Sequence, residues 1–305
     1  MKRFIFACSV FFVLACSGRS FEVPPVPENP QPPVQPEPAL REGDLRADGD
    51  TERTYDLIVG SGYNYETPDT SNDHSAAPFQ HIRQSWDEEL QRYVFDFYIH
   101  IDIDDDRGKP NITDRQRNEI KTDGRSPASM VGQQGERMLF RWKFRLPEGM
   151  KTTQQFCHVH QIKGIDNAAG TADVSMPLIT FTARTLSNGK RQLQVIYVLP
   201  TGAGGGNRYL ARADLDDFLG EWVEAEERIE CAEEGSYRLS IRRLRDGREL
   251  LAVPSTPLAM WRDGTTGMRP KWGIYRSFGK QGALKPDLRD EILKFADFEV
   301  KKQVQ

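Results

Sequence analysis

Three short stretches of this chain collect side chains that could bind an acidic substrate and move a proton. They are residues 114–121 (DRQRNEIK), 156–164 (FCHVHQIKG) and 269–276 (RPKWGIYR). We interpret each as a β-strand, in which successive side chains point to opposite faces. In the middle stretch this alternation places His158 and His160 on one face, whereas Gln161 and Lys163 share the other. Polar pairs are costly to bury without partners, so at least one pair should line a binding surface. The alternative is an edge or solvent-facing strand with hydrated side chains.

The two outer stretches alternate in the same way. The side chains expected to share a face are Arg117, Glu119 and Lys121 in the first stretch, and Lys271, Gly273 and Tyr275 in the last. An arginine such as Arg117 can hold a carboxylate through two parallel hydrogen bonds. A tyrosine can act as a general base or acid when nearby cations favour its ionised form. Lys271 and Arg276 flank Tyr275 in the sequence and are candidates for those cations.

Each of these residues also has a structural interpretation. Tyr275 and Trp272 could be aromatic core residues or sugar-stacking residues. Arg117 and Glu119 could form a cross-strand ion pair, and a structural role is the preferred one for Glu119. Lys163 could be a solvated strand residue.

Taken in order, the three stretches resemble the motifs of polysaccharide lyase family 7, the alginate lyases. Here they read Arg-x-Glu-Ile-Lys, Gln-Ile-Lys and Lys-x-Gly-x-Tyr, where that family has Arg-x-Glu-Leu-Arg, Gln-Ile-His and Lys-x-Gly-x-Tyr. The heparin lyase I and glucuronan lyase families share the jelly roll and a similar site. This chain departs from the pattern because Lys163 follows Gln-Ile and two histidines precede it. Those histidines lie on the opposite face unless a bulge realigns the strand. The departure favours a sister family of jelly-roll lyases.

The resemblance implies cleavage of a glycosidic bond next to a uronic acid by β-elimination. Hydrogen-bond donors neutralise the carboxylate, a base removes the C5 proton, and an acid protonates the leaving oxygen. The implied catalytic residues are Tyr275, His160, Gln161 and Arg117. The implied substrate-binding residues are His158, Lys163, Lys271, Arg276, Lys121 and Trp272. No metal or organic cofactor is required, and the expected partner is an anionic, uronate-containing polysaccharide.

Two other functions compete with this one. A non-catalytic carbohydrate-binding jelly roll could use Trp261, Trp272 and arginines as a platform. A glycoside hydrolase of the same fold would need two carboxylates about 5–10 Å apart. No Glu-x-Asp-x-x-Glu pattern stands out for the hydrolase.

The elements that must position these residues are mostly strands. Alternating apolar and polar segments occur at 93–103, 139–146, 178–184, 192–199, 237–244 and 294–301. So many strand signals, with scarce helical periodicity, predict an all-β domain, either a β-jelly roll or a concanavalin-like two-sheet sandwich. We assign it to residues 52–305, with one short helical turn within 214–219. We expect it to be a monomer.

The first fifty residues differ in composition from the rest. Residues 1–16 read as a bacterial lipoprotein signal, because Lys2 and Arg3 precede a short apolar run that ends at Ala15-Cys16. Cys16 is the expected lipid attachment site, and ordinary secretion is the alternative. Residues 17–51 form a proline-rich linker. These features predict a membrane-anchored lipoprotein in the periplasm or on the cell surface. The net charge of −4 argues against general nucleic-acid binding.

Three further features carry less weight. Asp102, Asp104, Asp105 and Asp106 lack the spacing of an EF-hand and suggest a solvated acidic turn, with a structural cation as the alternative. The GAGGGN run at 202–207 lacks the Lys-Ser/Thr ending of a phosphate-binding loop and suggests a loop between strands. Cys157 and Cys231 could pair or remain separate buried thiols.

Overall fold

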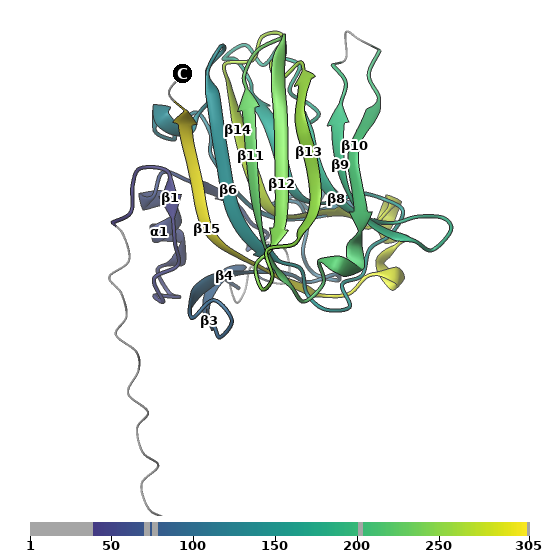
Figure 1. Cartoon of the computed structure of the whole chain (residues 1–305). Helices are drawn as coiled ribbons and strands as arrows, with labels where there is room; N and C mark the ends of the chain where they lie inside the picture. Colours follow the sequence, from purple (N-terminus) through teal and green to yellow (C-terminus); the bar gives the residue numbers. More distant parts are fainter. Residues whose placement is uncertain (1–38, 70–73, 75–78, 201–203, 304–305) are drawn as a thin grey trace, which may run out of the picture. The chain divides into compact units, whose positions relative to one another are not determined.

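The computed structural model describes residues 39–69, 74, 79–200 and 204–303. They fold into two antiparallel β-sheets, one lying in front of the other in Figure 1, with short connecting segments. Residues Leu40–Gln305 form one compact unit. The predicted all-β two-sheet architecture is therefore confirmed. The signal and most of the predicted linker lie outside the described residues.

The first sheet has the strand order β13-β12-β11-β6-β15-β4-β3, with β1 added beside β15. Its strands are β1 (Asp44–Leu45), β3 (Ile82–Asp87), β4 (Arg92–Ile99), β6 (Arg137–Arg145), β11 (Trp222–Glu230), β12 (Gly235–Arg243), β13 (Glu249–Leu258) and β15 (Glu291–Gln303). Two prolines, Pro254 and Pro257, lie in β13. Proline cannot donate to a neighbouring strand, which agrees with the place of β13 at the edge of the sheet.

The second sheet has the order β10-β9-β8-β7-β14-β5-β2. Its strands are β2 (Asn64–Glu66), β5 (Arg115–Lys121), β7 (Cys157–Ile165), β8 (Ile179–Thr185), β9 (Arg191–Val198), β10 (Asn207–Asp214) and β14 (Gly267–Ser277). The three stretches singled out in the sequence are β5, β7 and β14. They lie side by side in this sheet, with β14 between the other two.

Helical structure is limited to short pieces in the described residues. These are α1 (Thr54–Gly60) and the 3₁₀ turns η2 (Ala128–Met130), η4 (Leu215–Asp217), η5 (Lys280–Gly282) and η6 (Lys285–Asp287). The turn η4 falls within the segment where a helical turn is predicted, and the Asp214 carboxylate caps it by accepting from the backbone N–H of Asp216. Across the described ranges, no helix combines the length and apolar character needed to cross a membrane.

The hydrophobic core fills the space between the sheets. Each strand contributes alternate side chains to it, and the large aromatic residues Trp142, Phe181 and Trp272 are fully buried there. Cys157 and Cys231, the two cysteines within the described ranges, are buried and unpaired. The predicted strand segments match β4, β6, β8, β9, β12 and β15 within a few residues. Strand β4 stops at Ile99, earlier than predicted, because residues 100–103 turn away from the sheet.

The folded unit begins earlier than the predicted boundary at residue 52. Strand β1 pairs with β15, and Leu45 is fully buried in the core. The hydroxyl of Tyr63 donates a 2.6 Å hydrogen bond to the carbonyl of Gly43. The amide of Gln84 also binds the segment, accepting from the backbone N–H of Gly49. Residues 40–51 are thus part of the sandwich, because they complete a sheet edge that would otherwise be unpaired.

The glycine-rich run at 202–207 connects β9 to β10, as the sequence predicts for a loop between strands. Its first residues fall among 201–203, which are outside the described ranges. The acidic run near residue 104 differs from the solvated turn that the sequence predicts. Asp104 and Asp106 are only 3% and 2% exposed, so this segment is not a solvated turn.

Candidate active site

Tyr275 of β14 lies between the neighbouring strands β5 and β7 of the second sheet. Its Cα is paired with Arg117 of β5 on one side and with His158 of β7 on the other. Directly paired residues on neighbouring strands share a face, so these three side chains lie on the same side of the sheet. That side faces away from the core, and we call it the polar face.

A β-bulge in β7 decides which histidine reaches the polar face. The pairing of β7 with β8 shifts register between His158 and His160, which leaves Val159 as an extra residue. A bulge of this kind reverses the alternation beyond it. As a result His158, Gln161 and Lys163 share the polar face, whereas His160 points into the core. The predicted pairing of His158 with His160 on one face is therefore wrong.

His160 is a core residue, in contrast to its predicted catalytic role. Its side chain is fully buried, and its ring stacks on Trp142 with ring centroids 4.5 Å apart. Its Nε2 lies 2.7 Å from a carboxylate oxygen of Glu227 in the opposite sheet. Glu227 also accepts a 2.5 Å hydrogen bond from the hydroxyl of Tyr237. His160 belongs to a buried polar network that links the two sheets.

The hydroxyl of Tyr275 is held by an arginine that the sequence analysis did not assign. Arg115 donates a 2.9 Å hydrogen bond from Nη1 to Tyr275 Oη. The guanidinium carbon of Arg117 lies 3.6 Å from the centre of the tyrosine ring, in a cation–π contact. The ring of His158 is 5.9 Å away and that of Phe156 is 4.9 Å away, measured between centroids. Two guanidiniums thus contact Tyr275, Arg115 at the hydroxyl and Arg117 over the ring.

His158 is neutral at ordinary pH. Burial lowers the pKa of its imidazole to about 3, and the nearby guanidiniums of Arg184 and Arg117 act in the same direction. Its Nδ1 lies 2.8 Å from the hydroxyl of Thr182 on the adjacent strand β8, which fixes the orientation of the ring. This neutral, oriented imidazole lies beside the Tyr275 ring on the polar face.

A dense ion-pair network lies next to this pair. Arg117 donates 2.9 Å and 2.8 Å hydrogen bonds to Asp106 and Glu119. Lys271 binds both Glu119 and Glu66 through its ammonium group. A bidentate grip of Arg117 on a substrate carboxylate would compete with these bonds. The structure therefore gives Arg117 and Lys271 a structural place on the polar face, in contrast to their predicted direct roles.

The charges in the network stabilise one another. Burial alone would raise the pKa of Glu119, but Lys271 and Arg117 outweigh it and lower this pKa to about 2. The same two cations hold the pKa of Glu66 far below its ordinary value. Both carboxylates are therefore ionised at neutral pH. Lys121 and Gln161 complete the network, since Lys121 donates to Glu66 and Gln161 donates to Glu119.

Two further cations lie on the polar face with fewer bonds. Lys163 of β7 is paired with Arg269 of β14. Lys163 donates a 3.1 Å hydrogen bond to the carbonyl of Ser175, and burial lowers its pKa to about 8. The Nη1 of Arg269 is buried, and no described residue offers it a hydrogen-bond partner. This end of the face has donors that an anionic group could satisfy.

Two predicted substrate-binding residues of β14 point into the protein. Trp272 is fully buried in the core, and Arg276 is 1% exposed and donates a 2.7 Å hydrogen bond to Gln116. Both are an odd number of residues from Tyr275 along β14, so strand alternation places them on the core side. Trp261, proposed for a stacking platform, is also buried. Arg115 lies two residues from Arg117, and Arg269 lies six residues from Tyr275. Strand alternation therefore places both on the polar face, and the sequence pattern could have identified them.

Glu66 and Asp106 could not be found in that way. Glu66 comes from β2, more than fifty residues before Lys121, and reaches the site because β2 pairs with β5. Asp106 comes from a loop that meets Arg117 through an isolated bridge. Only the sheet order brings them together.

Comparison with solved structures supports the fold. A crystal structure of the family 7 alginate lyase A1-II′, a histidine-to-asparagine and tyrosine-to-phenylalanine variant in complex with a GGMG substrate, aligns with a TM-score of 0.50 at 13% identity. The alignment covers 82% of this chain and 95% of that one. The marine family 14 alginate lyase from Aplysia kurodai aligns with a TM-score of 0.52 at 11% identity, over 87% of this chain and all of that one. An endo-β-1,4-glucuronan lyase from Trichoderma reesei aligns with a TM-score of 0.45 at 15% identity, over 78% of this chain and 87% of that one.

The two alginate lyase structures define the chain as having the jelly-roll fold of polysaccharide lyases. The resemblance found in the three sequence motifs is thereby confirmed at the level of the fold. No protein-family model and no curated protein matches the sequence. The structural neighbours are lyases of uronate polysaccharides. At such low sequence identities, the structural similarity establishes a shared fold.

Proposed function

We propose that this protein is a polysaccharide lyase that cleaves an anionic, uronate-containing polysaccharide by β-elimination. The observation that carries the proposal is the pairing of Tyr275 with His158 on the polar face, with Arg115 hydrogen-bonded to the tyrosine hydroxyl. The neighbours in fold include an alginate lyase solved with its substrate, which supports the same reaction class.

Tyr275 and His158 are the proposed proton-transfer pair. Neutral His158 removes the proton at C5 of the uronic acid, and the C–H electrons form the C4–C5 double bond. The C4–O bond breaks, and the other residue supplies a proton to the leaving oxygen. Arg115 orients the Tyr275 hydroxyl through its hydrogen bond and Arg117 packs on the ring, while neutral His158 has one ring nitrogen without a proton.

The uronate carboxylate needs donors to neutralise it before C5 can be deprotonated. The amide of Gln161 is the proposed donor nearest the proton-transfer pair, and Lys163 and Arg269 are the proposed donors to a carboxylate farther along the polymer. The buried, unpartnered Nη1 of Arg269 supports this assignment, because a guanidinium N–H without a partner is costly in a protein. The ion-pair network holds the strands that present these groups.

The competing functions have less support. A glycoside hydrolase needs one carboxylic acid with a raised pKa to protonate the leaving group. Glu66 and Glu119, two carboxylates of the ion-pair network on the polar face, both have lowered pKa values. A stacking platform would need exposed aromatic rings, but Trp261 and Trp272 are buried.

The test is to incubate the purified protein with alginate, glucuronan and heparin and follow the ultraviolet absorbance of the unsaturated sugar. At least one polymer should give a rising signal. Binding of a polymer with no unsaturated product would support the carbohydrate-binding alternative. Reducing ends without the new absorbance would support a hydrolase.

We also propose that the protein is a lipoprotein anchored through Cys16 on a bacterial membrane. The support is the short apolar run that ends at Ala15-Cys16, followed by a proline-rich segment. Expression with a radiolabelled fatty acid should label the parent and not Cys16→Ala. Equal labelling of the two proteins would contradict the anchor.

A further inference from the structure

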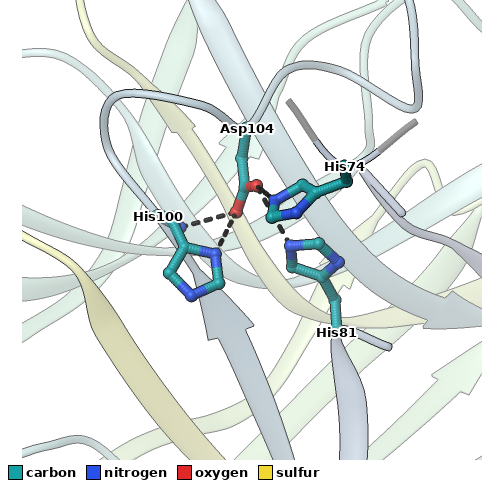
Figure 2. Close-up of side chains that lie close together, drawn as sticks. All are labelled: His74, His81, His100 and Asp104. Atoms are coloured by element: carbon teal, nitrogen blue, oxygen red, sulfur yellow. Dashed lines mark hydrogen bonds and ion pairs between the residues drawn. The ribbon is translucent and has the colours of Figure 1, made fainter. Parts of the chain in front are cut away.

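A second cluster of chemically active side chains lies outside the polar face. It consists of His74, His81, His100 and Asp104, and we call it the histidine cluster. His81 immediately precedes β3, His100 immediately follows β4, and Asp104 lies in the loop beyond it. One potential ligand atom from each residue lies within 4.8 Å of every other. Figure 2 shows the three imidazole rings gathered around the Asp104 carboxylate.

We propose that the histidine cluster binds a divalent transition-metal ion, with Zn²⁺ as the expected occupant. Three imidazole nitrogens and one carboxylate oxygen are a donor set that suits zinc in tetrahedral geometry. With bonds of about 2.1 Å, neighbouring ligand atoms in a tetrahedron are about 3.4 Å apart. The nitrogens of His74, His81 and His100 are already 2.9, 3.0 and 3.2 Å from Asp104 oxygens. Small side-chain shifts would therefore complete the site.

The surroundings are those of a supported metal site. The Nδ1 of His81 lies 2.8 Å from Asp69, which leaves Nε2 directed at the cluster. Metal-binding histidines commonly use the second nitrogen in this way. The backbone N–H of His100 donates a 2.5 Å hydrogen bond to Asp104 and fixes that carboxylate. The Phe79 ring lies 4.8 Å from His81 and 4.9 Å from His100, and the side chains of His81 and Asp104 are fully buried.

The alternative to a metal ion is a set of hydrogen bonds among the same four side chains. Without a metal, His81 contacts carboxylates through both nitrogens and would have to be an imidazolium. Asp104 would then accept from three rings at once. A metal ion satisfies the same geometry while each histidine stays neutral. The four donors come from the protein, so the site is closed, which is typical of a structural ion.

The structural role has a direct connection to the polar face. The Asp104 carbonyl accepts a 3.2 Å hydrogen bond from Gln116, the Asp105 carbonyl accepts one from the backbone N–H of Arg117, and Asp106 accepts from the Arg117 side chain. A metal bound to Asp104 would therefore fix the loop that positions Arg117. Metal binding itself does not depend on the proposed lyase activity.

The experiment uses the purified full chain, stripped with a chelator and then titrated with Zn²⁺. We expect about one Zn²⁺ per chain by elemental analysis after desalting. We also expect the Tm to rise by at least about 4 °C at saturation, because the ion binds only the folded state. His74→Ala and Asp104→Asn should each lose the bound ion and the Tm shift. His158→Ala, a histidine outside the cluster, should keep both.

Two results would overturn the proposal. The first is a parent protein that retains no Zn²⁺, Co²⁺, Ni²⁺ or Cu²⁺ after desalting and shows no Tm shift with any of them. The second is a shift of equal size in His74→Ala, which would place the ion elsewhere. If Asp104→Asn fails to fold, His74→Ala still decides the matter. Loss of the metal in His74→Ala with a retained β-sheet circular dichroism spectrum supports the proposal even when no polysaccharide is cleaved.

Discussion

At the scale of single residues, the hydroxyl of Tyr275 is the group on which the proposed reaction depends. Tyr275→Phe removes that oxygen and keeps the ring that Arg117 and Phe156 contact. General acid–base groups contribute roughly a hundredfold to ten-thousandfold in rate. We expect turnover to fall at least about a hundredfold, while glycan affinity and Tm change little. Steady-state assays of product absorbance would measure it, and near-normal elimination by the variant would contradict the mechanism.

The two histidines of β7 offer a matched comparison. His158→Gln should reduce turnover strongly with a small change in Tm, because His158 is on the polar face beside Tyr275. His160→Gln should lower the Tm, because it disturbs a buried contact with Glu227. Both variants carry the same substitution two residues apart. The opposite pattern, an active His158→Gln and a stable but inactive His160→Gln, would show that the bulge does not hold in solution.

At the scale of elements, the ion-pair network joins β2, β5 and β14. Because the pKa of Glu119 is lowered by Lys271 and Arg117, its ionised form stabilises the fold. That contribution is complete above the unfolded pKa of roughly 4.3 and is lost as the pH falls towards about 2. Melting curves between pH 7 and pH 3 should show a steep fall in Tm below about pH 5.

The control for this effect is Glu119→Gln. It should have a lower Tm at pH 7, since two buried cations lose a partner at a cost of about 3–5 kcal/mol. Its Tm should also change less steeply with acid than that of the parent. Parallel curves for the two proteins would mean that the acid sensitivity arises from other carboxylates.

At the scale of the whole molecule, the N-terminal boundary of the sandwich can be tested by deletion. Removing residues 1–38 leaves β1 in place, whereas removing residues 1–51 deletes it. The longer deletion removes the buried Leu45 and the Gly43 carbonyl that Tyr63 binds. Burial of one leucine is worth about 1.5–3 kcal/mol, so we expect a clearly lower Tm for the longer deletion. Equal melting temperatures for the two deletions would support the domain boundary at residue 52 that the sequence predicts.

The sequence by itself determined the all-β class, most strand positions and the three central strands of the candidate site. It could do so because strand alternation and turn residues are local properties. The shared face of Arg117, Glu119 and Lys121, and that of Lys271 and Tyr275, also followed from spacing alone.

Tertiary structure decided the rest. The bulge at Val159 arises where β7 pairs with its neighbours, and it exchanged the roles expected of His158 and His160. Sheet order brought Glu66 to Lys271 across about two hundred residues, and loop packing buried Asp104 among three histidines. Contacts between residues so distant in sequence depend on how strands pair, which no local pattern specifies.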